Sequence, residues 1–434
     1  MIRRSVRGLA LIIAIMACAV IAAAEDRVYT IEDAYRSALD THEYVKIAEE
    51  GVVQSDSKYD QAWSYVYPRI EGQAAYTRYN DTLPAGGDTF IFQPTGLFWA
   101  GLILTQPLYT GGRTMAGLRM TEKMQNESKS NLSQARQDIL LKVAEAYYGV
   151  LKSQKAIEIS RDSLTRMERH KQVTEREATT RKTKMNASTL LRANTLVSQA
   201  RINLVRSENG LRVSRDKLNL LTKLPTDALL AEPQAQELPS EGLDRLKEIA
   251  LKQRDDYVAA KLKQSIAAEN VTIVKGGHYP QVYAEAGLTY QNSHPSMVTD
   301  ATTYYGGLRL QIPFFEGGLM KAEVSDARSK ERQAELSTGY LRKSIESEVH
   351  EAYVDLQTLT SIMENAKLQV KYARENFIAI EGLYKEGMAI SLSLIDAEHS
   401  LSLSERELAG ATYEQQVAIL RLRKTIGMLG VEYQ

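Results

Sequence analysis

Few residues of this sequence have the types and spacing that catalysis or ligand binding requires. Gly111-Gly112 resembles part of a phosphate-binding loop, but it lacks both the GxGxxG pattern and a Gly-Lys-Ser/Thr ending. Asp396, Glu398 and His399 lie close together, and a solvated helix face explains them better than an acid–base site. The histidines are scattered without the spacing of a zinc site, at His42, His170, His278, His294, His350 and His399. We therefore expect no catalytic residue, no cofactor and no metal site, and a protein that is not an enzyme.

The composition limits the kinds of binding partner and bound group that the chain is expected to have. The chain of 434 residues carries 54 basic and 54 acidic side chains, so nothing in its charge indicates a nucleic-acid partner. Cys18 is the only cysteine, so the mature chain is expected to have neither a disulfide nor a thiolate metal site. Tyrosine is abundant (23) and phenylalanine scarce (6), which suits surfaces that are apolar at one end and wet at the other.

The first residues are typical of an export signal. A basic start is followed by an apolar core from Leu9 to Val20 and by the small residues Ala22–Ala24, so we expect cleavage after Ala24. A competing interpretation is a lipoprotein box at Ile15–Cys18. After Glu25 no stretch approaches the ~20 apolar residues of a spanning helix. If the mature chain enters a membrane, it must do so as a closed β-barrel.

The sequence contains an internal repeat. The segment from Gly101 to Gly112 returns as Gly307 to Gly318, so Pro107 matches Pro313 at an offset of 206. Upstream, Tyr67-Pro68 returns as Tyr279-Pro280 at an offset of 212. The expected segments are a signal peptide at 1–24, a first repeat at 25–222, a linker at 223–240 and a second repeat at 241–434.

Each repeat ends in a long segment that is free of proline and carries apolar heptads. No proline lies between Pro107 and Pro225 or after Pro313. Seven-residue spacing predicts coiled-coil helices at about 113–222 and 319–427, and one helix from 114 to 180 would reach ~100 Å. Taken alone, these heptads fit a soluble coiled-coil rod. The heptad positions are Val143, Val150, Ile157 and Leu164; Leu190, Val197, Leu204, Leu211 and Leu218; Val349, Leu356, Met363, Val370, Phe377 and Tyr384; and Leu394, Leu401 and Leu408.

The segments before the long helices alternate with a period of two. This alternation predicts β-hairpins at about 64–109 and 279–315, with Leu102 and Leu310 on an apolar outer face. A soluble half-buried hairpin gives the same pattern, and the export signal favours the membrane barrel. Four strands cannot close a barrel, so other copies of the chain must close it. The residues expected to face the barrel lumen are Arg69, Glu71, Glu285, Arg309 and Gln311.

Two motifs carry a family resemblance. A strand that ends in proline, an aromatic residue and paired glycines opens a very long helix at Gln106–Gly112 and again at Ile312–Gly318. A turn between long helices has its second copy at Gly387–Ala397 and its first at Thr183–Ala193, where threonine replaces the usual glycine. These motifs resemble the TolC family of outer-membrane efflux proteins over nearly the whole mature chain. The Asn-Pro usual in the opening helices of that family is absent.

The resemblance implies a fold and a function. The fold is a mixed α+β membrane protein of two tandem repeats, in which a trimer forms a barrel of about twelve strands continued by a tube of about twelve helices. The function is a passive exit duct between outer membrane and periplasm, fed by a periplasmic adaptor protein and an inner-membrane transporter. The alternative is a soluble periplasmic coiled-coil adaptor. The transported substrate is not revealed.

The resemblance also assigns roles to residues. The expected adaptor-docking tips are Lys184, Met185, Asn186, Ala187, Gly387, Met388, Ala389 and Ile390. The candidates for a periplasmic gate are Thr189, Arg192, Ser393 and Asp396. The strand-to-helix turns are Pro107, Gly111, Gly112, Pro313, Gly317 and Gly318.

Overall fold

The computed structural model divides the chain into two compact units. It describes residues 28–81, 83–84, 91–180, 184–236, 238–294 and 301–430. Unit 1 comprises the segments up to Ile47, Ser133–Arg254 and from Ser344 onward, and unit 2 comprises Ala48–Leu132 and Asp255–Lys343. The expected signal peptide at 1–24 lies outside the described residues.

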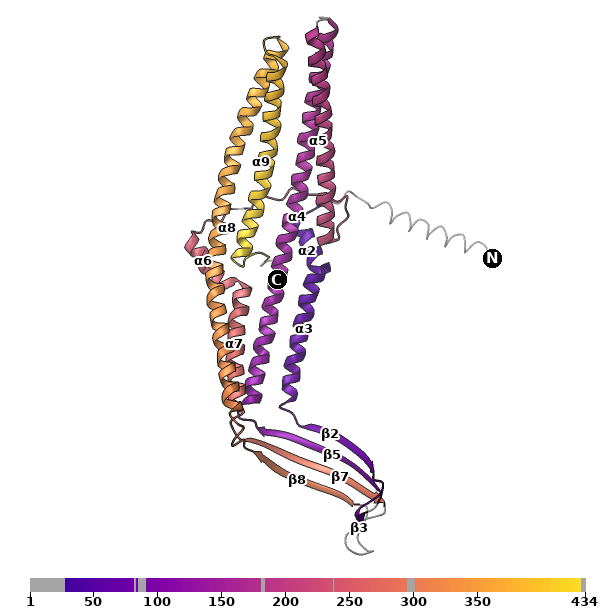
Figure 1. Ribbon diagram of the computed structural model, residues 1–434. Coiled ribbons are helices and arrows are strands. Elements are labelled where there is room, and N and C mark those ends of the chain that lie inside the picture. Colours follow the sequence, from indigo (N-terminus) through magenta and orange to yellow (C-terminus); the bar gives the residue numbers. More distant parts are fainter. Residues whose placement is uncertain are drawn as a thin grey trace, which may run out of the picture. The chain divides into compact units, whose positions relative to one another are not determined.

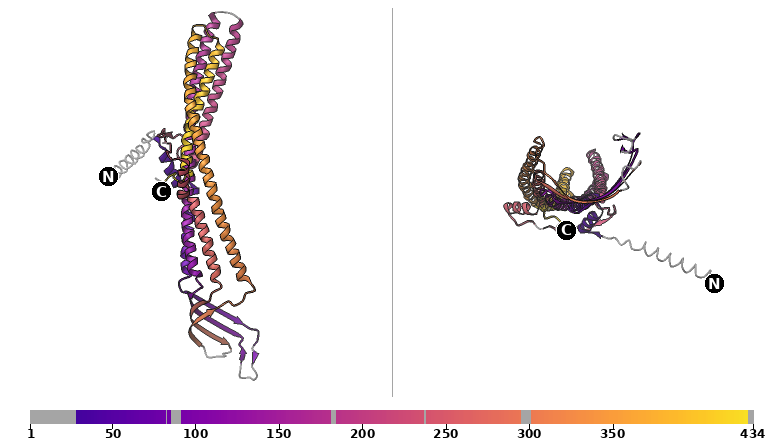
Figure 2. Two further views of the ribbon diagram at one scale, coloured as in Figure 1. Left: turned by 90° about the vertical axis from the view of Figure 1, so that its left-hand side faces the viewer. Right: turned by 90° about the horizontal axis from the view of Figure 1, so that it is seen from below.

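Unit 2 contains a four-stranded antiparallel sheet (Figure 1). Its order is β2 (Arg69–Arg78), β5 (Gly96–Tyr109), β7 (Gln281–His294) and β8 (Ala301–Gln311). A short pair, β3 (Leu83–Pro84) with β4 (Ile91–Gln93), lies between β2 and β5 in the sequence. The four strands form a curved sheet (Figure 2). The strand expected to reach 315 ends at Gln311, because the chain leaves the sheet at Pro313, which has no N–H to donate to a strand partner.

Polar contacts join the helices of unit 2. The start of α4 (Arg113–Thr180) packs against α7 (Asp255–Gly276), where Arg119 Nη2 and Lys123 Nζ lie 2.8 and 2.6 Å from the Glu269 carboxylate. These two cations lower the pKa of Glu269. Gln125 donates a hydrogen bond of 2.6 Å to Asp56 on α3 (Glu43–Ser64).

Unit 1 contains two helical hairpins. One joins α4 to α5 (Lys184–Thr222), and the other joins α8 (Leu319–Lys385) to α9 (Ser391–Thr425). Val143, Val150 and Val349 are fully buried, as the heptads predict. Within the described residues, no helix is both long and apolar enough to cross a bilayer.

The opening helix of each half is broken into two. The first break, at His42, separates α2 (Ile31–Thr41) from α3, and the second, at Arg254, separates α6 (Leu243–Gln253) from α7. Both residues have extended backbone angles, so each ends its helix, although its own N–H still donates to the carbonyl oxygen four residues earlier. The backbone N–H of Tyr44 donates to His42 Nδ1 at 3.1 Å, which satisfies one amide at the start of α3. The opening segment of each half therefore consists of two helices.

The linker is fixed by a short sheet that the sequence did not predict. β1 (Val28–Tyr29) pairs in parallel with β6 (Leu229–Leu230). The buried Tyr147 hydroxyl donates to the carbonyl oxygens of Tyr29 and Ala231, at 2.9 and 2.7 Å. Burial raises the pKa of Tyr147 and raises that of its neighbour Tyr148 to about 12.

Candidate functional site

The sheet of unit 2 has one polar and one apolar face. The register places Arg69 opposite Thr105 and Thr105 opposite Glu285, so these three side chains share a face. Alternation then puts the whole expected lumen set on that same face: Arg69, Glu71, Glu285, Arg309 and Gln311. Their role as a lumen lining stays a prediction.

Two exposed ion pairs lie on the polar face. Arg309 Nη2 is 2.6 Å from Glu285, and Arg69 Nη2 is 2.5 Å from Glu71. The Arg309 guanidinium also lies 5.2 Å from the centre of the Tyr283 ring. Exposed pairs of this kind contribute only ~0–1 kcal/mol. Their main effect is to place charge of both signs along one face.

Aromatic rings cover glycines on the polar face. The Tyr305 ring occupies the space where a side chain on Gly287 would lie, and Trp99 crowds Gly101 in the same way. Sequence analysis did not identify these pairs. The signal was the presence of glycines inside strands that also carry aromatic residues.

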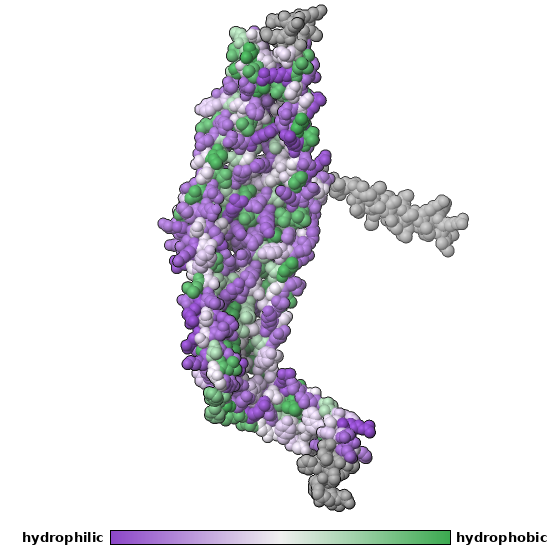
Figure 3. Space-filling model, viewed as in Figure 1, coloured by the Kyte–Doolittle hydropathy of each residue, from purple (hydrophilic) through white to green (hydrophobic). Residues whose placement is uncertain are grey.

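The opposite face is apolar, and no other described part of the single chain covers its leucines. The exposed fractions of Leu102, Leu308 and Leu310 are 53%, 74% and 61%. A further hydrophobic area lies where α7 and α8 meet the sheet (Figure 3). Phe314 and Phe315, which follow β8 in the sequence, are 91% and 87% exposed.

Paired glycines form both strand-to-helix turns. Gly111 and Gly112 have φ values of +66° and +81°, and Gly317 and Gly318 have +61° and +88°. This left-handed backbone disfavours any residue with a Cβ atom. The turns let the chain pass from β5 into α4, and from β8 through Pro313 into α8.

The turn between α8 and α9 is closed by Gly387. Gly387 has φ +76°, and the N–H groups of Gly387 and Met388 donate to the carbonyls of Tyr384 and Leu383 at 3.0 and 2.9 Å. These two bonds make a Schellman motif, in which glycine is strongly favoured at this position. Met388 and Ile390 are each 67% exposed.

Helix α5 begins earlier than the sequence motif indicates. α5 already begins at Lys184, so the backbone of Lys184, Met185, Asn186 and Ala187 belongs to its first turn. The turn expected from the motif at Thr183–Ala193 is therefore wrong for the residues from Lys184 onward. This segment lacks a glycine or proline, so the sequence gives no local stop signal. Thr183 itself lies outside the described residues.

The gate candidates lie just beyond these turns. Thr189 and Arg192 are on α5, and Ser393 and Asp396 are on α9. Arg192 and Asp396 are exposed. Among the described residues they make no ion pair with each other within one chain, and pairing between copies stays a prediction.

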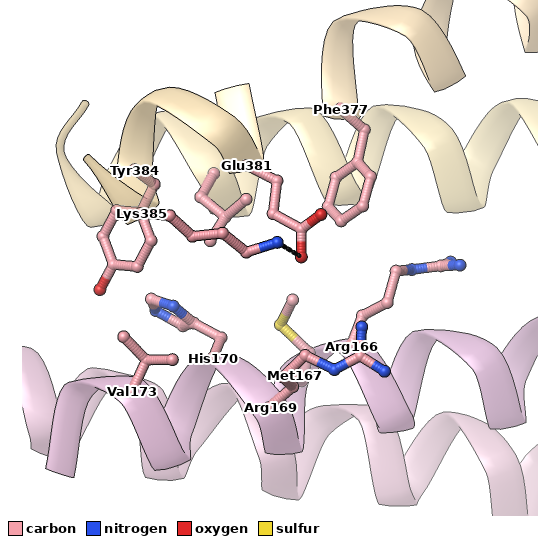
Figure 4. Close-up of a pocket in the computed structure, with 10 residues that line it drawn as sticks. Arg166, Met167, Arg169, His170, Val173, Phe377, Glu381, Tyr384 and Lys385 are labelled. Atoms are coloured by element: carbon pink, nitrogen blue, oxygen red, sulfur yellow. Dashed lines mark ion pairs between the residues drawn. The ribbon is translucent and has the colours of Figure 1, made fainter. Parts of the chain in front are cut away.

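A buried histidine joins the two hairpins near the α8–α9 turn. His170 on α4 is 3% exposed, and its Nε2 lies 3.0 Å from the hydroxyl of Ser391, the first residue of α9. Its ring lies edge-to-face on Tyr384 of α8, with centroids 5.3 Å apart (Figure 4). The ring borders a small cavity lined also by Arg166, Arg169, Val173, Glu381, Lys385 and Leu394. Among the described atoms, the buried Nδ1 of His170 has no hydrogen-bond partner.

The contact between the two hairpins also contains a buried carboxylate. Glu398 on α9 accepts a hydrogen bond of 2.6 Å from Ser163, and its carboxylate lies 3.4 Å from Arg166 Nε. Arg166 also lies 3.7 Å from Glu405. Sequence analysis assigned Glu398 to a solvated helix face, and this was wrong, because Glu398 is 6% exposed. His399, by contrast, is exposed.

Acid should weaken the contact that His170 makes. Burial lowers the pKa of His170, whereas an exposed histidine titrates at about 6.5. The packed arrangement therefore has its full stability above about pH 6.5 and loses up to ~1.4 kcal/mol per pH unit below that value. Hydrogen exchange in the first turn of α9 should become faster at pH 5.5 than at pH 7.5, after correction for intrinsic rates. His170→Gln should remove this acid effect and His399→Gln should retain it. An acid effect that persists in His170→Gln would contradict the assignment.

Comparison with known proteins identifies the family. The family model described as outer membrane efflux protein matches residues 34–222 and 246–428. The outer membrane protein TolC of Vibrio cholerae is 24% identical over 392 residues, which cover 84% of this chain and 83% of that protein. The probable outer membrane lipoprotein SilC of Salmonella typhimurium is 22% identical over 404 residues, covering 90% and 84%. The crystal structure of VceC from Vibrio cholerae matches with a TM-score of 0.78 at 18% identity, covering 92% of this chain and 96% of that one. The chain belongs to the outer membrane efflux protein family.

Proposed function

We propose that the chain is one subunit of a trimeric exit duct in the outer membrane, which passively conducts substrate out of the periplasm. The observation that carries this proposal is the two-faced sheet with its exposed apolar side. A soluble coiled-coil adaptor would leave Leu102, Leu308 and Leu310 in water on one contiguous face. Lipid would cover the same face at no such cost, while the charged face would line a water-filled lumen.

The sheet edges support assembly from several copies. The outer edges of β2 and β8 have no strand partner among the described residues. In lipid each unpaired backbone group costs several kcal/mol, so a single chain would be unstable there. Three copies would supply about twelve strands, which is within the range of bacterial outer-membrane barrels. The long helices would continue the duct as a tube of about twelve helices, with the linker and opening helices as a belt around it.

The partners follow from the same proposal. A cleavable signal at 1–24 would export the chain, although lipidation at Cys18 is an alternative that the name of the lipoprotein relative SilC supports. An inner-membrane transporter would supply the substrate, and a periplasmic adaptor would dock at the helix turns. Exposed Met388 and Ile390 supply apolar area for such docking. A cysteine at Ala389 should crosslink to the adaptor in cells. Crosslinks only from a cysteine at Gly86, which lies between β2 and β5 in the sequence, would invert the proposed orientation.

A duct of this width would leak if it stayed open, so we propose that it closes at the helix turns. Arg192 and Asp396 have opposite charges and equivalent places after the two turns. Pairing between neighbouring hairpins would contribute only ~0–1 kcal/mol each, but the copies act together on one open–closed equilibrium.

The conductance of the purified protein in planar bilayers tests the duct and its gate together. The wild type should form channels that are mostly closed. Asp396→Arg should raise the conductance, and Arg192→Asp added to it should partly restore closure. The absence of any channel from correctly folded protein would reject the duct. Normal channels that Asp396→Arg leaves unchanged would reject only the gate pair.

A further inference from the structure

The outer edges of β2 and β8, which are unpaired within the described part of the chain, can be matched residue by residue. β2, β5, β7 and β8 alternate in direction, so β8 runs antiparallel to β2. An antiparallel β8–β2 ladder between two copies would therefore use the same hydrogen-bond pattern as the ladders within the chain. Only its register is left to determine.

The two hairpins have the same register once the repeat offsets are applied. Arg69 lies opposite Thr105. Adding 212 to the first position and 206 to the second gives Gln281 opposite Gln311, which is the observed pair. At the other end, Arg78 opposite Gly96 becomes Tyr290 opposite Thr302, and this pair is also observed. The offsets found in the sequence thus predict the residue pairs of the β7–β8 ladder from those of the β2–β5 ladder without any shift in register.

The β5–β7 ladder joins the two halves of one chain and serves as a template for the junction between copies. In it Leu104 lies opposite Ala286, and Thr105 lies opposite Glu285. Adding 206 to a position in β5 gives the equivalent position in β8, and subtracting 212 from a position in β7 gives the equivalent position in β2. We propose that β8 of one copy pairs with β2 of the next in the register that places Leu310 opposite Ala74 and Gln311 opposite Gln73. This inference rests on the proposed function, because it requires several copies to close the sheet.

The faces of the sheet agree with this register. Leu310 and Leu308 would lie opposite Ala74 and Tyr76, all on the apolar face. A shift by one residue would turn the whole apolar row of β2 toward the charged face, which sheet packing does not tolerate. Registers two residues away keep the faces and must be separated by a second argument.

The glycine turns supply that argument. A side chain on Gly111 would overlap the carbonyl oxygen of Gly276 and would lie 2.9 Å from Tyr279 Cβ, so this turn packs tightly against the end of α7. A side chain on the equivalent Gly317 would meet no described atom of the single chain within 4 Å. The residue of the first repeat that is equivalent to Tyr279, at an offset of 212, is Tyr67, which is 61% exposed.

The proposed neighbour fills that open position. Gly317 of one copy would lie against Ser64 and Tyr67 of the next, as Gly111 lies against Gly276 and Tyr279. The β5–β7 template has a bulge after Pro107 that pairs Tyr109 with Val282. The same offsets therefore place Phe315 opposite Ile70, and these side chains are 87% and 67% exposed in the single chain. A shift of two residues would move Gly317 away from Tyr67. The exposed aromatic residues that follow β8, Phe314 and Phe315, are therefore part of an interface with a second copy rather than a surface for lipid alone.

Disulfide crosslinking in the outer membrane tests the register. Residues directly opposite in an antiparallel ladder have Cα atoms ~4.5–5.5 Å apart, which is within disulfide range. Leu310→Cys combined with Ala74→Cys in one chain should give covalent dimers and a closed trimer on oxidation. The yield should exceed by at least tenfold that of Leu310→Cys with Tyr76→Cys or with Gly72→Cys. The wild type, whose only cysteine is Cys18, should give none.

Each outcome has a separate meaning. Preferred crosslinking to position 72 or 76 would overturn the register and leave the oligomer intact. A trimeric mass without crosslinking at any of the three positions would overturn the β8–β2 junction. A monomeric mass in lipid would reject the proposed oligomer itself.

Discussion

Leu102→Arg should prevent most of the protein from assembling in lipid, whereas Ile103→Arg in the next position should not. Leu102 is on the apolar face of the central strand β5, and an arginine at the middle of the bilayer costs ~2–4 kcal/mol. Ile103 faces the other way and lies opposite Glu71, which would accept the new charge. The two variants differ only in the face that carries the arginine.

The yield of heat-resistant oligomer in lipid vesicles measures this difference, and urea titration of the folded fraction gives its free energy. Leu310→Arg on β8 should behave as Leu102→Arg does, and Gln311→Asn should be tolerated. Equal loss for Leu102→Arg and Ile103→Arg would mean that the faces of the sheet are wrongly assigned.

Gly111→Ala should destabilise the chain more than Gly112→Ala. Both glycines have left-handed backbone, so either substitution costs ~1–2 kcal/mol in conformational strain. Only at Gly111 would the new methyl group overlap the carbonyl oxygen of Gly276, whereas at Gly112 it would meet nothing within 4 Å. Overpacking adds ~1–3 kcal/mol, which should appear as the difference between the two variants.

Urea unfolding of the purified variants in one detergent gives that difference, with far-ultraviolet circular dichroism as the probe. Gly276→Ala should resemble Gly111→Ala, because a side chain on Gly276 would overlap Arg113 and crowd the Gly111 carbonyl oxygen. Equal destabilisation at Gly111 and Gly112 would show that backbone strain alone, without overlap with Gly276, explains the effect of both substitutions.

The sequence predicts the repetitive parts of this fold well, because repetition averages over many residues. The heptads through Val143, Val150 and Val349 identify buried helix faces, since each turn adds the same signal. The alternation around Leu102 and Leu310 identifies the two faces of the sheet for the same reason.

Features that depend on single residues or on distant contacts were missed. The breaks at His42 and Arg254 contain neither glycine nor proline, so no local signal distinguishes them from helix. Tyr147 holds the two strands of the β1–β6 sheet through residues that are 118 and 84 positions away. His170 looks like a surface histidine in the sequence, because its partners Tyr384 and Ser391 belong to the other hairpin.

The mass of the purified protein in lipid nanodiscs tests the central claim most directly. Native mass spectrometry should give three copies of the mature chain in each particle, because the outer edges of β2 and β8, which have no strand partner among the described residues, would be paired by other copies. Particles that contain a single folded chain, with β2–β8 protected from hydrogen exchange, would contradict the proposed duct.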